Sequence, residues 1–91
     1  MKTLGQALKK LLQDLEIENQ VHQYQAVTLW PRIVGDKIAS VTRAEKVEHQ
    51  VLFIRVSNDS WRNELFYMKK DIIEKLNAKL GQKIIKDIRL Y

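Results

Sequence analysis

The sequence predicts one small α+β domain, and three observations support this fold class. The chain has 91 residues, a length that suits a single domain with one hydrophobic core. Apolar side chains recur every three or four residues in three segments, which is the helical period, and three other segments have the pattern of strands. No repeat, low-complexity tract or linker rich in glycine, serine or proline divides the chain, so we expect one domain over residues 1–91.

Two helices are predicted before residue 35. The leucines of residues 2–15 all fall on one stripe of a helix: Leu4, Leu8, Leu11, Leu12 and Leu15. The polar residues 16–20 interrupt the pattern, and a second helix follows over residues 21–34, with a kink or an early end at Pro31. We therefore divide the domain into an amphipathic helix, residues 1–18, and a core, residues 19–91. The leucine stripe is expected to dock on this core, and pairing with another chain is the alternative.

The rest of the chain predicts a hairpin, a long helix and a last strand. Residues 36–40 are ambiguous between a loop and one helical turn, and residues 41–48 and 51–56 are strands joined by a turn at residues 49–50. A helix then covers residues 61–80, after a cluster of N-capping residues, and residues 83–91 form the final strand. The order α-α-β-β-α-β predicts a small three-stranded sheet with helices on one face. Its other face would be open and carry Phe53, Arg55 and Arg89.

The positive net charge of the chain has two interpretations. It favours binding to a polyanion, or it only keeps the chain soluble. The formal net charge is +5, and residues 41–91 hold eleven basic and seven acidic side chains. The basic side chains of the predicted hairpin and long helix are the candidates for nonspecific phosphate contacts: Arg43, Lys46, Arg55, Arg62, Lys69 and Lys70. Phe53 and Trp61 are the candidates for contact with a partner. The simpler interpretation of Phe53 is a partly covered surface aromatic, and that of Trp61 is packing in the core.

Several function classes have no support in the sequence. There are no cysteines, which excludes a disulfide scaffold, a thiolate zinc site and a thiol nucleophile. Neither a glycine-rich phosphate loop nor the GxxG loop of KH domains is present, and His22 and His49 have no ligand-like spacing. Asp71 and Glu74 are flanked by lysines, which is typical of a surface charge network. We therefore expect a protein that is not an enzyme and has no metal or cofactor. We also expect no membrane span and a cytoplasmic location.

Three motifs in order resemble one known family. Residues 30–39, WPRIVGDKIA, are similar to its W-x-x-[IV]-[VL]-G-x-x-[IL]-A signature. Residues 51–65, VLFIRVSNDSWRNEL, resemble its central strand and the S-x-x-W-x-x-E-L start of the next helix. Leu76-Asn77, Gly81 and the closing residues 85–90 resemble its L-N…G…V…I-R ending. On these motifs the chain is identified as a member of the DciA family, the bacterial replicative-helicase operators, from about Leu4 onward.

The resemblance implies a KH-like fold and a bacterial cytoplasmic protein that assists loading of the DnaB-type replicative helicase. Members of the family bind the helicase and DNA without an ATPase of their own, and Trp61 matches the second tryptophan of the family. Many members carry long additional tails, whereas the present chain is nearly the bare domain. Two other functions stay open: a stand-alone KH-like module that binds single-stranded nucleic acid through Phe53, and a structural domain that oligomerises through its leucine helix.

Overall fold

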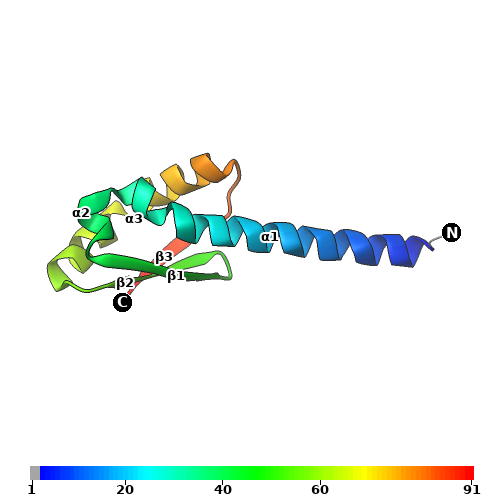
Figure 1. The fold of residues 1–91 in the computed structure, drawn as a ribbon, viewed down its shortest axis with the longest axis horizontal. Helices are drawn as coiled ribbons and strands as arrows, with labels where there is room; N and C mark the ends of the chain where they lie inside the picture. The colour runs from blue at the N-terminus through cyan, green and yellow to red at the C-terminus, as the bar shows by residue number, and fades with distance from the viewer. Residues whose placement is uncertain (1–2) are drawn as a thin grey trace.

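Three helices and a mixed three-stranded sheet make up the computed structural model, which describes residues 3–91 (Figure 1). The helices are α1 (Leu4–Val34), α2 (Asp36–Ala39) and α3 (Asp59–Leu80). The strands are β1 (Thr42–Glu48), β2 (Val51–Val56) and β3 (Asp87–Leu90). In the sheet order β1-β2-β3, β1 is antiparallel to β2 and β3 is parallel to it. The predicted α+β class and element order are therefore confirmed.

Helix α1 is one continuous helix of 31 residues, so the predicted break at residues 16–20 is wrong. Its start is fixed by a capping box, in which the Thr3 hydroxyl accepts from Gln6 N and Thr3 N donates to Gln6 Oε1. The supposed break consists mostly of good helix formers, and polarity alone does not end a helix that water surrounds. The helix also continues through Pro31 to Val34, where Gly35 ends it with a φ of 87°. The second helix of the element order is thus the short α2.

The N-terminal half of α1 projects from the body of the molecule (Figure 1). With this helix included, the molecule measures 59 × 21 × 18 Å. Every residue from 3 to 21 is exposed, and the five leucines of the stripe are 48–87% exposed. The expected docking of the leucine stripe on the core is therefore wrong. The cause is geometric: a straight helix whose C-terminal half lies on a short sheet carries its N-terminal half beyond the end of that sheet.

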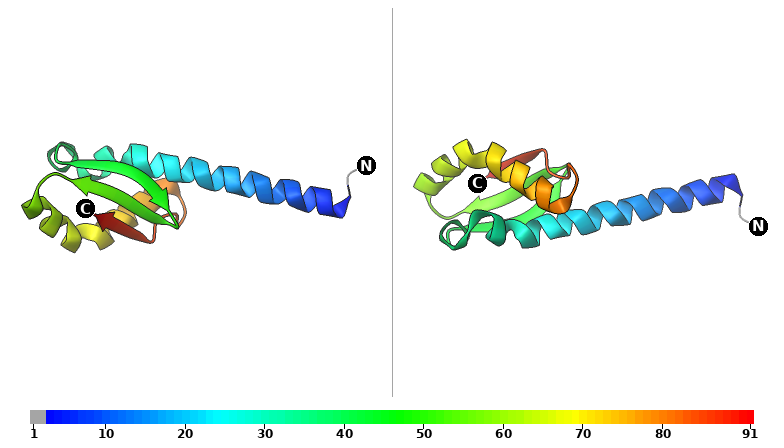
Figure 2. Two further views of the ribbon diagram at one scale, coloured as in Figure 1. Left: turned by 90° about the horizontal axis from the view of Figure 1, so that it is seen from below. Right: turned by 90° about the horizontal axis from the view of Figure 1, so that it is seen from above.

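The core lies between the sheet and the two long helices, which cover the same face of the sheet (Figure 2). Leu52, Ile54 and Val56 point from β2 into this core, as the alternation of residues 51–56 predicts. They meet buried side chains of both helices: Ala26, Trp30, Leu65, Ile72 and Leu76. Trp30 is a core residue, and its Nε1 donates to Thr42 Oγ1 at 2.9 Å, which satisfies the indole in its buried position.

The hairpin of β1 and β2 contains the predicted turn and one irregularity. His49 and Gln50 both have positive φ, as a tight two-residue hairpin turn requires. The pairing register shifts between Ala44 and Lys46, so that Glu45 is the extra residue of a β-bulge.

The last strand is shorter than predicted, because the side chain of Asn77 takes up the backbone hydrogen bonds of the residues that precede the strand. Asn77 Oδ1 accepts from Ile84 N and Ile85 N, and Asn77 Nδ2 donates to Ile85 O. Ile84 and Ile85 are consecutive and both buried, which a strand with one face on the core cannot achieve. Strand pairing with β2 therefore begins only at Asp87. Within residues 3–91, no helix is both long enough and apolar enough to cross a lipid bilayer.

Candidate nucleic-acid interface

The face of the sheet opposite the helices carries aromatic and basic side chains in adjacent rows. Lys46, Phe53 and Arg89 are cross-strand partners in one row. In the next row Arg43 pairs with Arg55, and Tyr91 continues the row because its backbone bonds to both Ile54 and Val56. The row at the far end, beside Val51, holds the acidic Glu48 and Asp87. The basic and aromatic rows therefore form one surface, which we call the open sheet face.

Phe53 lies at the centre of the open sheet face between two cations. Lys46 Nζ is 5.0 Å and Arg89 Cζ is 6.0 Å from the centroid of its ring. Tyr91 meets the same ring edge-on at a centroid distance of 6.3 Å. Both cations lie over the ring of Phe53, so a base can stack on this ring only when at least one of them moves aside toward the phosphates. This arrangement suits single-stranded nucleic acid, whose bases are free to stack.

The bulge residue Glu45 organises the row beside Phe53. Its carboxylate accepts from Arg55 Nε at 2.7 Å and from the Tyr91 hydroxyl at 2.6 Å. These hydrogen bonds, first from Tyr91 and then from Arg55, hold the pKa of Glu45 below its usual value. The hydrogen bond with Glu45 raises the pKa of Tyr91. The hydrogen bond between Glu45 and Arg55 likewise raises the pKa of Arg55. Arg55 also lies 4.8 Å from the Tyr91 ring, so Glu45 holds a cation and an aromatic together.

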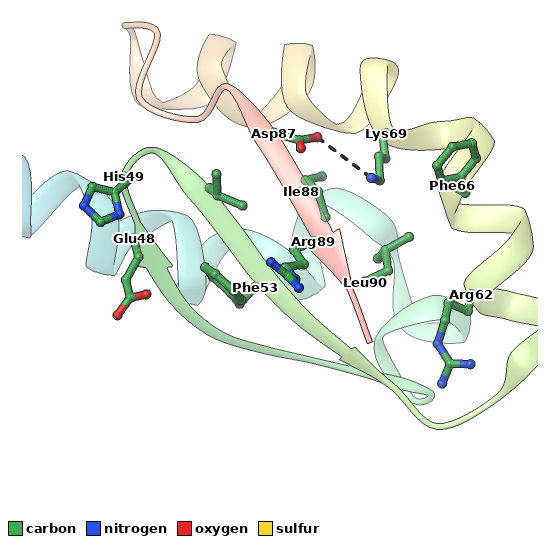
Figure 3. A pocket seen from close by; sticks show the side chains of 11 residues that line it. Glu48, His49, Phe53, Arg62, Phe66, Lys69, Asp87, Ile88, Arg89 and Leu90 are labelled. Atoms are coloured by element: carbon green, nitrogen blue, oxygen red, sulfur yellow. Dashed lines mark ion pairs between the residues drawn. The ribbon is translucent and has the colours of Figure 1, made fainter.

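A groove of about 590 Å³ leads from the open sheet face around the edge strand β3 to helix α3 (Figure 3). Phe53 and Arg89 line it from the sheet, and Arg62, Phe66 and Lys69 line it from α3. Its two acidic residues, Glu48 and Asp87, lie toward the hairpin turn, and Asp87 faces Lys69 at 3.9 Å. A strand of nucleic acid that crosses Phe53 could continue along the basic part of this groove.

The structure brings most of the predicted basic residues together. Arg43, Lys46 and Arg55 share the open sheet face, and Arg62 and Lys69 border the groove beside it. Arg62 is partly occupied, since it pairs with Asp59 and donates to Val56 O at 2.9 Å. Lys70 instead lines a second hollow with Asn77 and Lys83, apart from Phe53.

Trp61 is half-buried at the start of α3, where Asn58 caps the helix by accepting from Trp61 N. One side of the indole packs against the hydrophobic core, and Lys37 Nζ lies 5.8 Å from the ring centroid. Trp61 is thus both a packing residue and a surface residue, in contrast to the buried Trp30. It does not line the groove that contains Phe53.

Three residues of this surface are absent from the set of candidates chosen on the sequence: Arg89, Tyr91 and Phe66. Arg89 and Tyr91 alternate with Ile88 and Leu90, so the period of the last strand already places them on the face of Phe53. Phe66 is 58% exposed beside Lys69 Nζ, at 5.0 Å. Phe66 lies off the apolar stripe of α3, and an aromatic residue in such a position is the sequence signal that identifies it as a surface residue. Among residues 3–91, no three His, Cys, Asp or Glu side chains are grouped as ligands for a metal ion.

The fold and this surface define a small α+β domain that presents an aromatic and basic sheet face. A family model described as "Dna[CI] antecedent, DciA" matches residues 3–90. The chain is also 29% identical over 90 residues to a UPF0232 protein of Corynebacterium glutamicum (strain R), a match that covers 99% of the chain. The chain spans about half, 51%, of the length of that relative. The chain belongs to the DciA family, as its sequence motifs indicate.

Proposed function

We propose that this chain is a non-enzymatic adaptor of bacterial DNA replication, which binds a DnaB-type replicative helicase and DNA and assists loading of the helicase. DciA membership over residues 3–90 supports the helicase part of the proposal. The position of Phe53 between Lys46 and Arg89 is the observation that carries the DNA part. We further propose that the chain acts in the cytoplasm as one domain, with no small-molecule substrate.

The DNA part of the proposal follows from the chemistry of the open sheet face. A ring such as Phe53 stacks on any base, and the surrounding cations contact phosphates, so binding is independent of sequence. Stacking requires bases that are not already paired, which favours single strands over duplex DNA. A double charge reversal, Lys46→Glu with Arg89→Glu, replaces attraction by repulsion on both sides of Phe53 and leaves the buried side chains of β2 unchanged. We expect this variant to lose binding of a fluorescent single-stranded oligonucleotide at 50 mM salt.

The helicase part of the proposal assigns contact with the partner to Trp61. A half-buried tryptophan beside a cation has the properties of an interface anchor, because its side chain is rigid and partly exposed. Calorimetric titration of the chain into the replicative helicase of the same organism is the test. We expect micromolar or tighter binding that weakens about tenfold in Trp61→Leu, a change that keeps an apolar side chain against the core.

A second aromatic of the same helix provides the control for this experiment. Tyr67 is 79% exposed on α3 and does not line the groove, so Tyr67→Leu should bind the helicase like the wild type. Equal weakening by both variants would contradict the assignment of Trp61. Absence of helicase binding, together with retained binding to single-stranded DNA, would contradict the adaptor. It would support a stand-alone nucleic-acid-binding module, which the Phe53 arrangement alone also favours.

A further inference from the structure

A second hollow, of about 670 Å³, lies between helix α3 and the chain that leads into β3. Residues 83 and 85–87 line it from one side, and Gln50 of the hairpin turn also borders it. The residues that line it from α3 share one face of the helix, because they are one, three or four positions apart: Lys69, Lys70, Ile73, Glu74 and Asn77. None of the lining residues is aromatic, in contrast to the groove that contains Phe53.

The two walls of the second hollow are joined by the side chain of Asn77. Its Oδ1 accepts from Ile84 N at 3.1 Å and from Ile85 N at 2.9 Å, and its Nδ2 donates to Ile85 O at 2.8 Å. Lys86 N also donates to Gln50 O at 2.8 Å, which ties the same segment to the hairpin. The walls are therefore fixed before any ligand arrives, and a preformed site loses less free energy on binding than a mobile one.

Lysines make up most of the rim of the second hollow. Lys69 pairs with Asp87 at 3.9 Å. The other three are exposed and form no ion pair among residues 3–91: Lys70, Lys83 and Lys86. Glu74 is the second carboxylate of the lining, so four lysines face two carboxylates. The excess of positive charge attracts an anionic partner.

The interior of the second hollow favours a peptide over a nucleic acid. Ile73 is half-buried on α3 and Ile85 is buried in the opposite wall, so both walls offer apolar surface to an apolar side chain. The bases of a single strand bind chiefly by stacking on aromatic rings, which this lining lacks. Glu74 repels phosphates, whereas it can accept hydrogen bonds from the backbone N–H groups of a peptide.

We propose that the second hollow docks an acidic peptide segment of a partner protein. One large apolar side chain of the segment lies between Ile73 and Ile85, and carboxylates on both sides of it meet Lys70, Lys83 and Lys86. The apolar side chain fixes the position of the segment, and the charges speed its association. This docking is independent of the proposed adaptor function, since neither the aromatic ring assigned to DNA nor the tryptophan assigned to the helicase lines the second hollow.

A synthetic peptide with alternating acidic and apolar residues tests the chemistry of the site. Fluorescence anisotropy of a labelled peptide of sequence DDLDDLDD, titrated with the full chain at low salt, should give saturable binding with a Kd of about 0.1 mM or tighter. The peptide DDSDDSDD has the same charge and should bind about tenfold more weakly, because it has no apolar side chain to bury. Absence of saturable binding up to about 1 mM, or equal binding of the two peptides, would overturn the proposal.

Charge reversal on the rim tests the location. Lys70→Glu with Lys83→Glu should weaken binding of DDLDDLDD about tenfold or more, because both side chains then repel its carboxylates. Lys9→Glu with Lys10→Glu makes the same change of charge on the projecting half of α1 and is the matched control, which should bind the peptide like the wild type. All four lysines are exposed, so neither variant disturbs the core. Equal weakening by the two variants would overturn the assignment to the second hollow.

Single-stranded DNA distinguishes this site from the DNA path. The Lys70→Glu/Lys83→Glu variant should lose no more affinity for a labelled oligonucleotide than the Lys9→Glu/Lys10→Glu control, since both carry the same net charge. A rim variant that loses DNA binding beyond this control and keeps peptide binding would overturn the proposal. The second hollow would then be part of the nucleic-acid interface.

Discussion

The projecting half of α1 and the open sheet face are both uncovered, but they differ in how their side chains are satisfied. On the sheet, Phe53 is flanked by Lys46 and Arg89, and Glu45 holds Arg55 and Tyr91 by hydrogen bonds. On the helix, the leucines contact water and have no such neighbours in the described part of the chain. A surface of the first kind is stable in water and attracts a polyanion, whereas one of the second kind gains free energy only by meeting apolar surface.

The strongest contrast is expected in folding stability. Leu76 is fully buried, so Leu76→Ala should lower the free energy of unfolding by about 2–5 kcal/mol. Leu15→Ala, the same change on the exposed stripe, should cost less than about 0.5 kcal/mol. Urea denaturation followed by circular dichroism measures both. A large loss in Leu15→Ala would mean that the stripe packs on the body in solution.

The second largest effect is expected in the response of DNA binding to salt. If Arg43, Lys46, Arg55 and Arg89 contact phosphates, affinity for single-stranded DNA should fall roughly fiftyfold between 50 and 200 mM salt. Fluorescence anisotropy of a labelled oligonucleotide measures this affinity. A DNA affinity that does not respond to salt would contradict the phosphate contacts.

Removal of the Phe53 ring should weaken DNA binding at the open sheet face and leave the projecting half of α1 unaffected. Phe53→Ala should weaken single-strand binding about tenfold, because stacking on one base contributes about 1–3 kcal/mol. The inner residues of β2 are unchanged, so the folding stability should stay close to the wild-type level. Tyr24→Ala removes an aromatic that is 70% exposed on α1 and is the matched control. Equal loss in both variants would point to a general effect of exposed aromatics.

These contrasts also explain which parts of the molecule the sequence predicts. The alternation of residues 51–56 and the stripe of residues 61–80 are local patterns, and both elements occur where the patterns place them. Whether the leucine stripe is covered depends on the length of α1 relative to the sheet, which no local pattern contains. The same holds for Asn77, whose hydrogen bonds to Ile84 and Ile85 shorten the last strand.

For the candidate site, sequence reasoning identifies the centre and misses part of the rim. Phe53, Lys46 and Arg55 follow from the period of the hairpin. The role of Glu45 does not, because it depends on a bulge that shifts the register of β1 by one residue. The meeting of Arg62 and Lys69 with Arg89 depends on how α3 lies against the edge of the sheet. Such contacts between distant segments are visible only in the folded chain.

The smallest effect is expected at Glu45. Glu45→Gln removes a negative charge beside Phe53 and should tighten DNA binding about threefold. Because the folded-state pKa of Glu45 is lowered by Tyr91 and Arg55, its stabilising contribution is present above its unfolded pKa of about 4.5 and is lost as the pH falls through the lowered value. The difference in melting temperature between wild type and variant should therefore be constant from pH 7 to pH 5.5 and vanish in stronger acid. A difference that grows with acidity would contradict this sign.

The most direct test of the open sheet face is nuclear magnetic resonance of the isotopically labelled chain during titration with single-stranded DNA. We expect the largest changes in amide chemical shift at Lys46, Phe53, Arg89 and Tyr91, and no change at residues 4–21. Changes confined to α3 or to the projecting half of α1, with these four amides unaffected, would contradict the proposal that DNA binds the open sheet face.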